Sequence, residues 1–303
     1  MKKFIFKIAL ITVVFIAILS FILMRYGGNV DYFYLKFTTP KQSSFILGDS
    51  RSLQGIQPSV VNEYFQNNEF EMPMFNYSFT VTQAAYGPVY TQSVKNKLNE
   101  STKNGLFILN VNPWLFAQRE MDDYKKGIFM EADNPPHNMR FVSANPNFEY
   151  LYKNYDYFHF KSIFRQNSEL HKDGWLEEKN LSTDPKVLSE WKKKQMSIYK
   201  GFAKRWKKTT FRMASFEKMI AFLEAHGKVV IVRMPIDKEI LQIEDDFWSS
   251  FDSDMERIAA ENDVPYINFS TTTTFKMYDG NHIDKFGGVQ FTRQLCDSIK
   301  SNR

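Results

Sequence analysis

A serine, an aspartate and a histidine occupy positions from which nucleophilic chemistry is possible. Ser50 ends the segment Leu47–Ser50 (Leu-Gly-Asp-Ser), where a tight turn after an apolar run would present its hydroxyl at a strand end. Asp279 and His282 share a single predicted loop near the C-terminus. A histidine within reach of a serine can take its proton, and an aspartate can orient the imidazole. The pattern predicts a serine nucleophile if folding brings the two loops together.

Amide and guanidinium side chains stand near the same strand ends. Asn112 and Asn76 each follow an apolar run, and either amide could donate a hydrogen bond to a developing oxyanion. Arg51 directly follows Ser50, and Arg233 lies just beyond another predicted strand, where it could hold an anionic substrate. The alternatives are an ion pair for Arg233 and ordinary turn roles for the asparagines. We expect these side chains to gather at one edge of a sheet.

The elements that must position these residues alternate between strands and helices. Short apolar runs and longer amphipathic stretches follow each other, and both end in turn residues. The predicted strands are Ser44–Leu47, Pro73–Tyr77, Leu106–Val111, Val229–Val232 and Pro265–Phe269. The predicted helices are Pro58–Phe65, Gln83–Asn99, Ser215–Ala225, Phe247–Asn262 and Lys285–Ser298. This order predicts an α/β fold, a doubly wound three-layer α/β/α domain with a five-stranded parallel sheet whose carboxyl edge binds the ligand.

The alternation breaks between about residues 114 and 210. This stretch is rich in aromatic and charged residues, and it predicts a mainly helical insert. Within it, Trp191–Lys208 carries many lysines and no acid. Such a run fits either a solvated helix face or contact with anionic glycan or lipid headgroups. After the insert, the acidic run Glu244–Asp246 predicts N-terminal capping of the helix that follows it.

The N-terminus predicts a membrane segment. From Phe4 to Met24 the only polar residues are Lys7, Thr12 and Ser20, and such a run can cross about 30 Å of hydrocarbon as a helix. The lysines before it favour an N-terminus inside the cell. A cleaved signal peptide and a buried helix are the alternatives, but no small-residue cleavage site follows Ser20. We expect an anchor over residues 1–25, a linker over 26–42, and a periplasmic or extracellular domain over 43–303.

Composition narrows the classes of function. The chain has 303 residues and a formal net charge of +5, which is too modest to favour nucleic acid. Cys296 is the only cysteine, so no intramolecular disulfide can form. His137, His159, His171 and His226 show no metal-ligand spacing, and no phosphate-loop or dinucleotide motif is present. We expect no metal, no cofactor and no nucleic-acid partner.

Taken in chain order, these residues resemble the SGNH/GDSL hydrolase superfamily. Gly48–Ser50 matches its first motif and Asp279–His282 its last, while Asn112 matches best the asparagine of its third motif. The resemblance covers about residues 43–112 and 228–300. It implies a flavodoxin-like fold in which the serine attacks an ester carbonyl and the Asp-x-x-His pair activates it. It also implies an oxyanion hole of backbone N–H groups and the third-motif asparagine.

Two departures from the family pattern favour a different class of function. Asn76 stands in the neighbourhood where the family usually has a glycine, and Arg51 places a bulky cation beside the nucleophile. The alternative is a non-catalytic glycan-binding or scaffold protein on a degenerate form of the fold. A lipid-processing thioesterase or lipase is a further alternative.

The anchor adds a resemblance to the branch of the superfamily that modifies envelope polymers. That branch includes alginate O-acetyltransferase proteins and teichoic-acid D-alanyl transfer proteins, and Val111–Phe116 is similar to a run of the latter. The resemblance implies an esterase or O-acyltransferase that acts on acyl esters of a cell-envelope glycan. Water as the second nucleophile makes an esterase, whereas a sugar hydroxyl makes a transferase. It also implies a multi-pass membrane O-acyltransferase as a partner.

Overall fold

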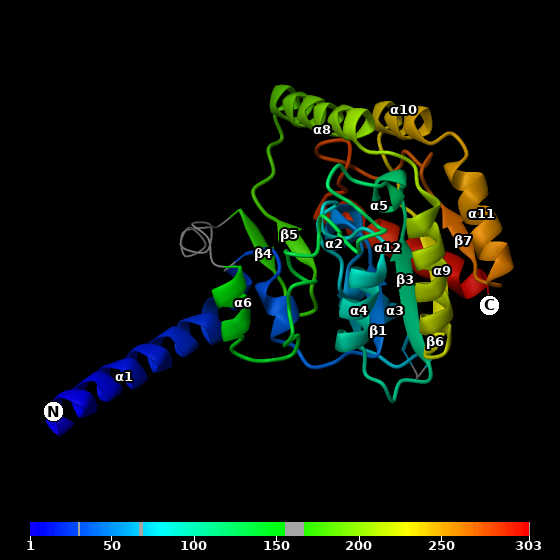
Figure 1. Cartoon of the computed structure of the whole chain (residues 1–303). Helices are drawn as coiled ribbons and strands as arrows, with labels where there is room; N and C mark the ends of the chain where they lie inside the picture. Colours follow the sequence, from blue (N-terminus) through cyan, green and yellow to red (C-terminus); the bar gives the residue numbers. More distant parts are fainter. Residues whose placement is uncertain (30, 67–68, 155–166, 303) are drawn as a thin grey trace.

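In the described residues 1–29, 31–66, 69–154 and 167–302 of the computed structural model, five parallel strands form the central sheet (Figure 1). Its order is β2-β1-β3-β6-β7. The strands are β1 (Ser44–Leu47), β2 (Met74–Asn76), β3 (Gly105–Asn110), β6 (Gly227–Arg233) and β7 (Tyr266–Asn268). Counted within the sheet alone this is the doubly wound order 2-1-3-4-5. The predicted parallel sheet is confirmed.

Successive residues of each strand point to opposite faces of the sheet, and both faces are buried. Phe45 pairs in register with Phe107, and Ile46 pairs with Ile108. The two phenylalanines belong to one hydrophobic cluster and the two isoleucines to another. Continuous apolar runs are what a sheet covered on both faces requires.

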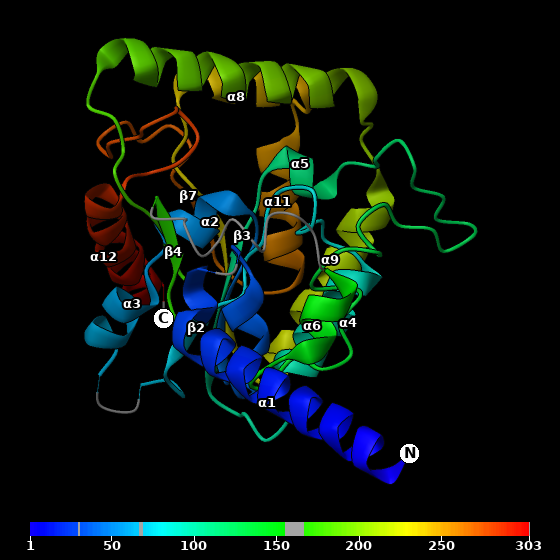
Figure 2. The same cartoon turned by 90° about the vertical axis from the view of Figure 1, so that its left-hand side faces the viewer.

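Helices cover the two faces of the sheet and complete three layers (Figure 2). One face carries α4 (Pro88–Lys97), α9 (Thr210–Glu224) and α11 (Phe251–Glu261). The other face carries α3 (Pro58–Tyr64) and α12 (Lys285–Ser301). Further elements are α2 (Ser50–Gly55), α5 (Pro113–Phe116), α6 (Phe148–Lys153), β4 (Ser168–Leu170), β5 (Leu176–Glu178), α8 (Pro185–Arg205) and α10 (Lys238–Phe247).

The insert is less regular than the sequence predicted. Alongside the long helix α8, its described part contains turns over residues 117–147 and the antiparallel hairpin β4–β5. Buried ion pairs hold the irregular part: Arg119 with Glu131, and Arg212 with both Asp122 and Glu131. These partners are far apart in the sequence, so their pairing does not show in a local pattern of apolar and polar residues. The mainly helical insert is therefore corrected to a mixed one.

The first helix, α1 (Lys2–Tyr26), is long and apolar enough to cross a membrane. The stretch after it packs against the domain and does not form the expected linker over 26–42. Tyr34, Lys36 and Phe37 are fully buried in a short 3₁₀ turn. The Lys36 ammonium donates to the backbone carbonyls of Asn76 and Gly174, and burial lowers the pKa of this lysine well below its ordinary value. Aromatic packing outweighs the flexibility that the neighbouring glycines suggested.

Helix α8 lies across the carboxyl edge of the sheet, beside α10 (Figure 1). Its inner side joins a hydrophobic cluster that contains Trp114, Tyr199, Phe202, Trp206 and Ile240. The sequence did not predict α10 as a helix. Together the two helices form a roof over the edge at which the candidate residues gather.

Candidate active site

Ser50 lies at the start of α2, directly after the turn that follows β1. Gly48 has a φ of +139°, and a Cβ there would lie 2.7 Å from the Cβ of Asn110. Glycine alone tolerates both the backbone conformation and this close approach. Asp49 caps α2 and accepts hydrogen bonds from the side-chain amides of Asn110 at 2.8 Å and Asn112 at 2.7 Å. These contacts fix the turn, and with it Ser50, to the end of β3.

The side chains of Ser50, His282 and Asp279 form one hydrogen-bonded chain. His282 Nε2 lies 2.9 Å from Ser50 Oγ, and His282 Nδ1 lies 2.8 Å from Asp279 Oδ2. Because an ionised carboxylate only accepts hydrogen bonds, Nδ1 carries the imidazole hydrogen and Nε2 can accept the serine proton. His282 and Asp279 are buried, while Ser50 is partly exposed. This geometry has the form of a nucleophile, a base and an orienting acid in contact with one another.

The backbone of the same loop holds Asp279 in place. Its Oδ1 accepts from the N–H groups of Asn281 at 2.9 Å and His282 at 2.8 Å. Burial alone would raise the pKa of Asp279, but interaction with His282 and these hydrogen bonds outweigh burial and lower the pKa below its ordinary value. Asp279 therefore stays ionised at neutral pH and remains an acceptor for the imidazole.

Asn281 brings a second donor to the imidazole. Its Oδ1 accepts from Arg51 Nε at 2.9 Å and from the Tyr199 hydroxyl at 2.7 Å. Since a guanidinium only donates, the amide must turn its Nδ2 towards His282 Nε2, 3.0 Å away. The Ser50 hydroxyl and the Asn281 amide thus converge on one nitrogen. The sequence placed Asn281 inside a motif but assigned it no role.

The side chain of Arg51, the bulky cation expected beside the nucleophile, is engaged with other protein groups. Its side chain is buried, and its guanidinium forms an ion pair with Glu244 in addition to the bond with Asn281. The backbone of Arg51 follows Ser50, but its charge points into the protein. Arg51 therefore supports the Asp279–His282 loop through its hydrogen bond to Asn281.

Arg233 is also buried, and it forms the ion pairs that were the alternative to anion binding. Its guanidinium lies 3.0 Å from Glu244 and 2.7 Å from Asp252. The predicted capping role of Glu244–Asp246 is wrong, because α10 ends at Phe247 and the acidic run lies in its last turn. Glu244 is instead the buried acid shared by both arginines. The sequence carried no signal for this partnership across distant elements.

The two asparagines expected to stabilise an oxyanion are fully buried and already engaged. Asn76 donates to the backbone carbonyls of Ser52 at 2.8 Å and Ile56 at 3.1 Å, where α2 ends. Asn112 donates to Asp49 and caps α5 with its oxygen. Both amides are fixed by these structural bonds, which corrects the prediction that they bind substrate.

A cavity of about 310 Å³, here called the Ser50 cavity, opens beside Ser50 and His282. Thr80 from the loop after β2 and Tyr32 from the stretch after α1 line it. Asn76 is absent from the described residues that border it. Its volume lies at the small end of the range for small-molecule sites. The cavity therefore has room for an acyl group with a small part of the molecule that carries it.

Helix α8 supplies one side of the Ser50 cavity. Gln195, Ile198, Tyr199 and Phe202 lie on one face of the helix and line the cavity. Gln195 Nε2 also donates to Asp279 Oδ2 at 3.0 Å. These four residues were not predicted as site residues, because they lie inside the lysine-rich run. The only sequence signal for their role was their spacing, which places them on one face of a helix among charged residues.

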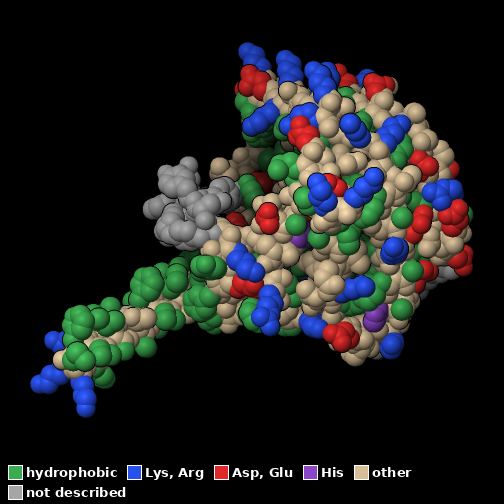
Figure 3. Space-filling model, in the orientation of Figure 1, with side chains coloured by type: hydrophobic (Ala, Val, Ile, Leu, Met, Phe, Trp, Pro, Cys, Tyr) green, Lys and Arg blue, Asp and Glu red, His purple; other side chains and the backbone are tan. Residues whose placement is uncertain are grey.

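The opposite face of α8 is basic and solvated. Lys193, Lys194, Lys200 and Lys204 are exposed on it, and Lys and Arg side chains stand along this helix at the top of the molecule (Figure 3). The lysine-rich run thus covers the outside of a helix whose inside borders the Ser50 cavity.

The remaining histidines of the described residues contact other groups. His137 lies beside the Gln83 carbonyl, and His226 beside the Thr102 carbonyl, while His171 pairs with Glu177. His159 lies outside the described residues. Across the described ranges, no group of three or more potential metal ligands occurs.

Comparison with known proteins yields only distant structural likeness. No protein-family model and no curated protein matches the sequence. An aryl esterase from M. smegmatis matches in native and inhibitor-bound forms at 8% identity and a TM-score of 0.40, over 86% of this chain and 100% of that chain. A carbohydrate acetylesterase from Sinorhizobium meliloti matches at 9% identity and a TM-score of 0.40, over 86% of this chain and 99% of that chain. Likeness this distant assigns neither a family nor an activity to the chain.

Proposed function

We propose that this protein is a serine-dependent enzyme that cleaves or transfers acyl esters. The observation that carries the proposal is the chain of hydrogen bonds from Ser50 Oγ to His282 Nε2 at 2.9 Å and from His282 Nδ1 to Asp279 at 2.8 Å. Ser50 and His282 border the Ser50 cavity, so the Ser50 hydroxyl is accessible to a ligand. In the proposal Ser50 is the nucleophile, His282 the base and Asp279 the orienting acid.

In the first step, Ser50 Oγ attacks the carbonyl carbon of the ester while His282 Nε2 takes the hydroxyl proton. The C–O bond to the leaving alcohol then breaks, and His282 returns the proton to that oxygen. The acyl group is left on Ser50. A second nucleophile, water or a sugar hydroxyl, gives its proton to His282 and attacks the acyl carbon. The bond between that carbon and Ser50 Oγ then breaks, and His282 returns the proton to Ser50 Oγ.

The tetrahedral intermediate needs hydrogen-bond donors for its negative oxygen. We assign this task to the backbone N–H of Ser50 and to that of Thr80, which borders the Ser50 cavity on the β2 side. The assignment takes the place of Asn76 and Asn112, whose amides are committed to other partners.

The proposed setting is the outer face of a membrane. Helix α1 would remain as the anchor, with Lys2, Lys3 and Lys7 on the inner side, and the domain would then lie outside the cytoplasm. The substrate would be an acylated cell-envelope glycan, and a multi-pass membrane acyltransferase could supply the acyl group. Protease digestion of intact and lysed cells checks this topology: the domain should be cleaved in intact cells once any outer barrier is opened.

The non-catalytic alternative loses one of its two supports. It rested on Arg51 as a bulky cation beside the nucleophile, and the guanidinium of Arg51 instead pairs with Glu244 behind the loop. The second support is unchanged: Asn76 stands where the family usually has a glycine, and its side chain caps the end of α2. Catalysis is thus the better supported of the two functions.

Activity of a Ser50→Ala variant towards p-nitrophenyl acetate tests the proposal. Loss of the nucleophile from a working triad costs about 10⁶ in kcat in the best-studied case, so activity should fall to background. Ser197→Ala is the matched control, because Ser197 is exposed on the outer side of α8. Unchanged hydrolysis by the Ser50→Ala protein would refute the mechanism.

A further inference from the structure

Helix α1 reaches the domain without a free linker between them. Leu23 is buried in the hydrophobic cluster that contains Tyr34 and Tyr150, and Leu19 packs against the same cluster. A membrane span needs about 20 apolar residues, and the apolar run of this chain ends at Met24. The span therefore includes residues that contact the domain. When α1 crosses a bilayer, the part of the domain beside it lies at the lipid surface.

Helix α6 belongs to this part of the domain. The ring of Tyr150, in α6, stacks on Phe37 with centroids 5.0 Å apart and meets Tyr34 edge-on at 5.5 Å. Both partners lie in the 3₁₀ turn that follows α1. Figures 1 and 2 show α6 near the domain end of α1 and across the domain from α8. The surface of α6 and of the loop before it therefore faces the side from which α1 leaves.

The aromatic and basic residues on this side are here called the α6 face: Lys95, Arg140, Phe141, Phe148 and Tyr152. Its three aromatic side chains are 55%, 43% and 87% exposed in that order. The Glu149 carboxylate accepts from the backbone N–H groups of Arg140 and Phe141, which ties the loop to α6. Exposed aromatic rings are typical of protein surfaces that lie at a membrane–water boundary.

The cations of the α6 face carry charge that the described protein groups do not balance. A hollow of about 540 Å³ borders Lys95 and Arg140, and in its lining Lys41 pairs with Glu100 at 2.9 Å. Among the described residues, no carboxylate forms an ion pair with Lys95 or Arg140. Their charged groups lie instead 4.8 and 5.5 Å from the centres of aromatic rings. Unbalanced cations beside a bilayer attract its anionic headgroups.

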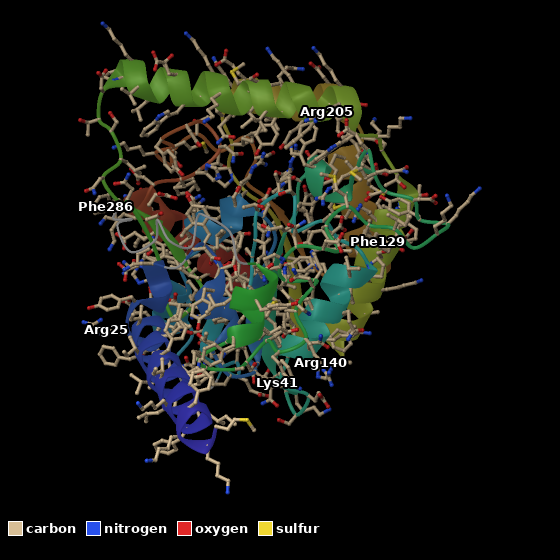
Figure 4. All side chains as sticks on the ribbon, turned by 60° about the vertical axis from the view of Figure 1, so that its left-hand side comes forward. Arg25, Lys41, Phe129, Arg140, Arg205 and Phe286 are labelled. Carbon is tan, nitrogen blue, oxygen red and sulfur yellow. The ribbon has the colours of Figure 1, made fainter. Side chains whose placement is uncertain are left out.

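The outer face of α8 is richer in lysine, but it lies at the other end of the molecule. Figure 4 shows Arg205 of α8 at one end, and Lys41 and Arg140 at the other end, on the same half as α1. The packing of Leu19 and Leu23 fixes α1 to that half. Position, and not the number of charges, therefore selects the α6 face for contact with the membrane.

We propose that the α6 face docks on anionic phospholipid headgroups of the membrane that α1 spans, and so holds the domain in one orientation. The proposal rests on the anchor assigned under the proposed function and is independent of the chemistry at Ser50. Phe148 and Tyr152 lie at the boundary between headgroups and acyl chains, and Lys95 and Arg140 contact lipid phosphates. The lysines on the outer face of α8 point away from the bilayer.

Fluorescence of a single label on the full chain in nanodiscs tests this orientation. Cys296 is buried, so a cysteine introduced by Tyr152→Cys or by Ser197→Cys can be labelled selectively with an environment-sensitive dye. The nanodiscs contain phosphatidylcholine, phosphatidylglycerol and a nitroxide-labelled lipid as quencher. The label at position 152 should be strongly quenched, and the label at position 197, on the outer side of α8, should not. Equal quenching at the two positions would overturn the proposal.

A label introduced by Val14→Cys reports on the anchor separately, because Val14 lies in the middle of α1 and is exposed. Quenching at position 14 without quenching at position 152 would contradict the docked face and leave the anchor intact. Quenching at position 152 alone would support the docked face and contradict the anchor. The absence of quenching at both positions would contradict both.

Charge variants of the Tyr152→Cys protein test the headgroup contact. Removing two cations from an anionic surface should lower the ratio of docked to undocked domain roughly 30-fold. Quenching at position 152 should therefore fall when Lys95→Gln and Arg140→Gln are combined. The matched control combines Lys200→Gln and Lys204→Gln on the exposed face of α8, and it should leave the quenching unchanged. Equal quenching in the two double variants, or in nanodiscs of phosphatidylcholine alone, would refute docking on anionic headgroups.

Discussion

Replacement of Asp279 by asparagine should move the imidazole hydrogen of His282 from Nδ1 to Nε2 without disturbing the loop. Asp279 Oδ1 accepts two backbone N–H groups, from Asn281 and His282, so the amide oxygen of the variant must stay on that side. The amide nitrogen then takes the place of Oδ2, which lies 2.8 Å from His282 Nδ1. It can only donate there, so Nε2 has to carry the imidazole hydrogen.

The consequence is a base that points its hydrogen at Ser50 and cannot accept the serine proton. The equivalent exchange in a serine protease lowers kcat by about 10⁴, which corresponds to about 5 kcal/mol of lost transition-state stabilisation. Gln195 adds to the effect here, because its Nε2 donates to the same carboxylate oxygen at 3.0 Å and would meet another donor. We expect a loss of at least about 10⁴.

Steady-state hydrolysis of p-nitrophenyl acetate measures this loss. A companion variant, Gln195→Leu, removes one hydrogen bond to the carboxylate and should cost only about ten-fold, since bonds to charged groups contribute about 1.5–3 kcal/mol and this one is partly solvated. Thermal unfolding of each variant controls for folding. Asp279→Asn activity within ten-fold of the wild type would refute the proposed role of the aspartate.

Two further predictions concern stability. Arg51→Met removes a buried cation from Glu244 and should lower the free energy of unfolding by about 3–5 kcal/mol; urea titration measures this against Lys204→Met on the exposed face of α8, which should change little. Burial lowers the pKa of Lys97 to about 7, so between about pH 7 and pH 9 the unfolded chain binds the proton that the folded protein lacks. Lys97 should contribute about 1.4 kcal/mol per pH unit to the rise in stability over that range, so the slope should be smaller by about this amount in Lys97→Met. Identical slopes would contradict this assignment.

The sheet and the triad were the predictable parts of this structure. Apolar runs such as Leu106–Val111 have the pattern of strands buried on both faces, and their order along the chain determines the doubly wound arrangement. Ser50 and His282 could be paired in advance because both follow strand ends that meet at one edge. This part of the prediction needed only local patterns and general rules of α/β topology.

The partners of the triad could not be predicted, because they come from elements whose placement depends on tertiary packing. Gln195 and Tyr199 lie on α8, where the sequence shows mainly lysines. Glu244 was interpreted as a helix cap, yet it is the buried acid between Arg51 and Arg233. Nothing in a local window indicates which distant charge a buried arginine will meet.

The amides show the limit of transferring a role by position. Asn112 follows β3 as expected, but its side-chain amide donates to the carboxylate of Asp49, in the turn after β1. Asn76 likewise meets the open carbonyls at the end of α2. A strand end supplies polar residues for structure and chemistry alike, and only the contacts distinguish the two.

Covalent labelling with a fluorophosphonate tests the central claim, a serine made nucleophilic by its histidine. The account predicts one adduct per chain, located by peptide mass spectrometry on Ser50. The adduct should be absent from Ser50→Ala and should form far more slowly in His282→Ala. A folded wild-type protein that takes up no label, or takes it up equally without His282, would contradict the account.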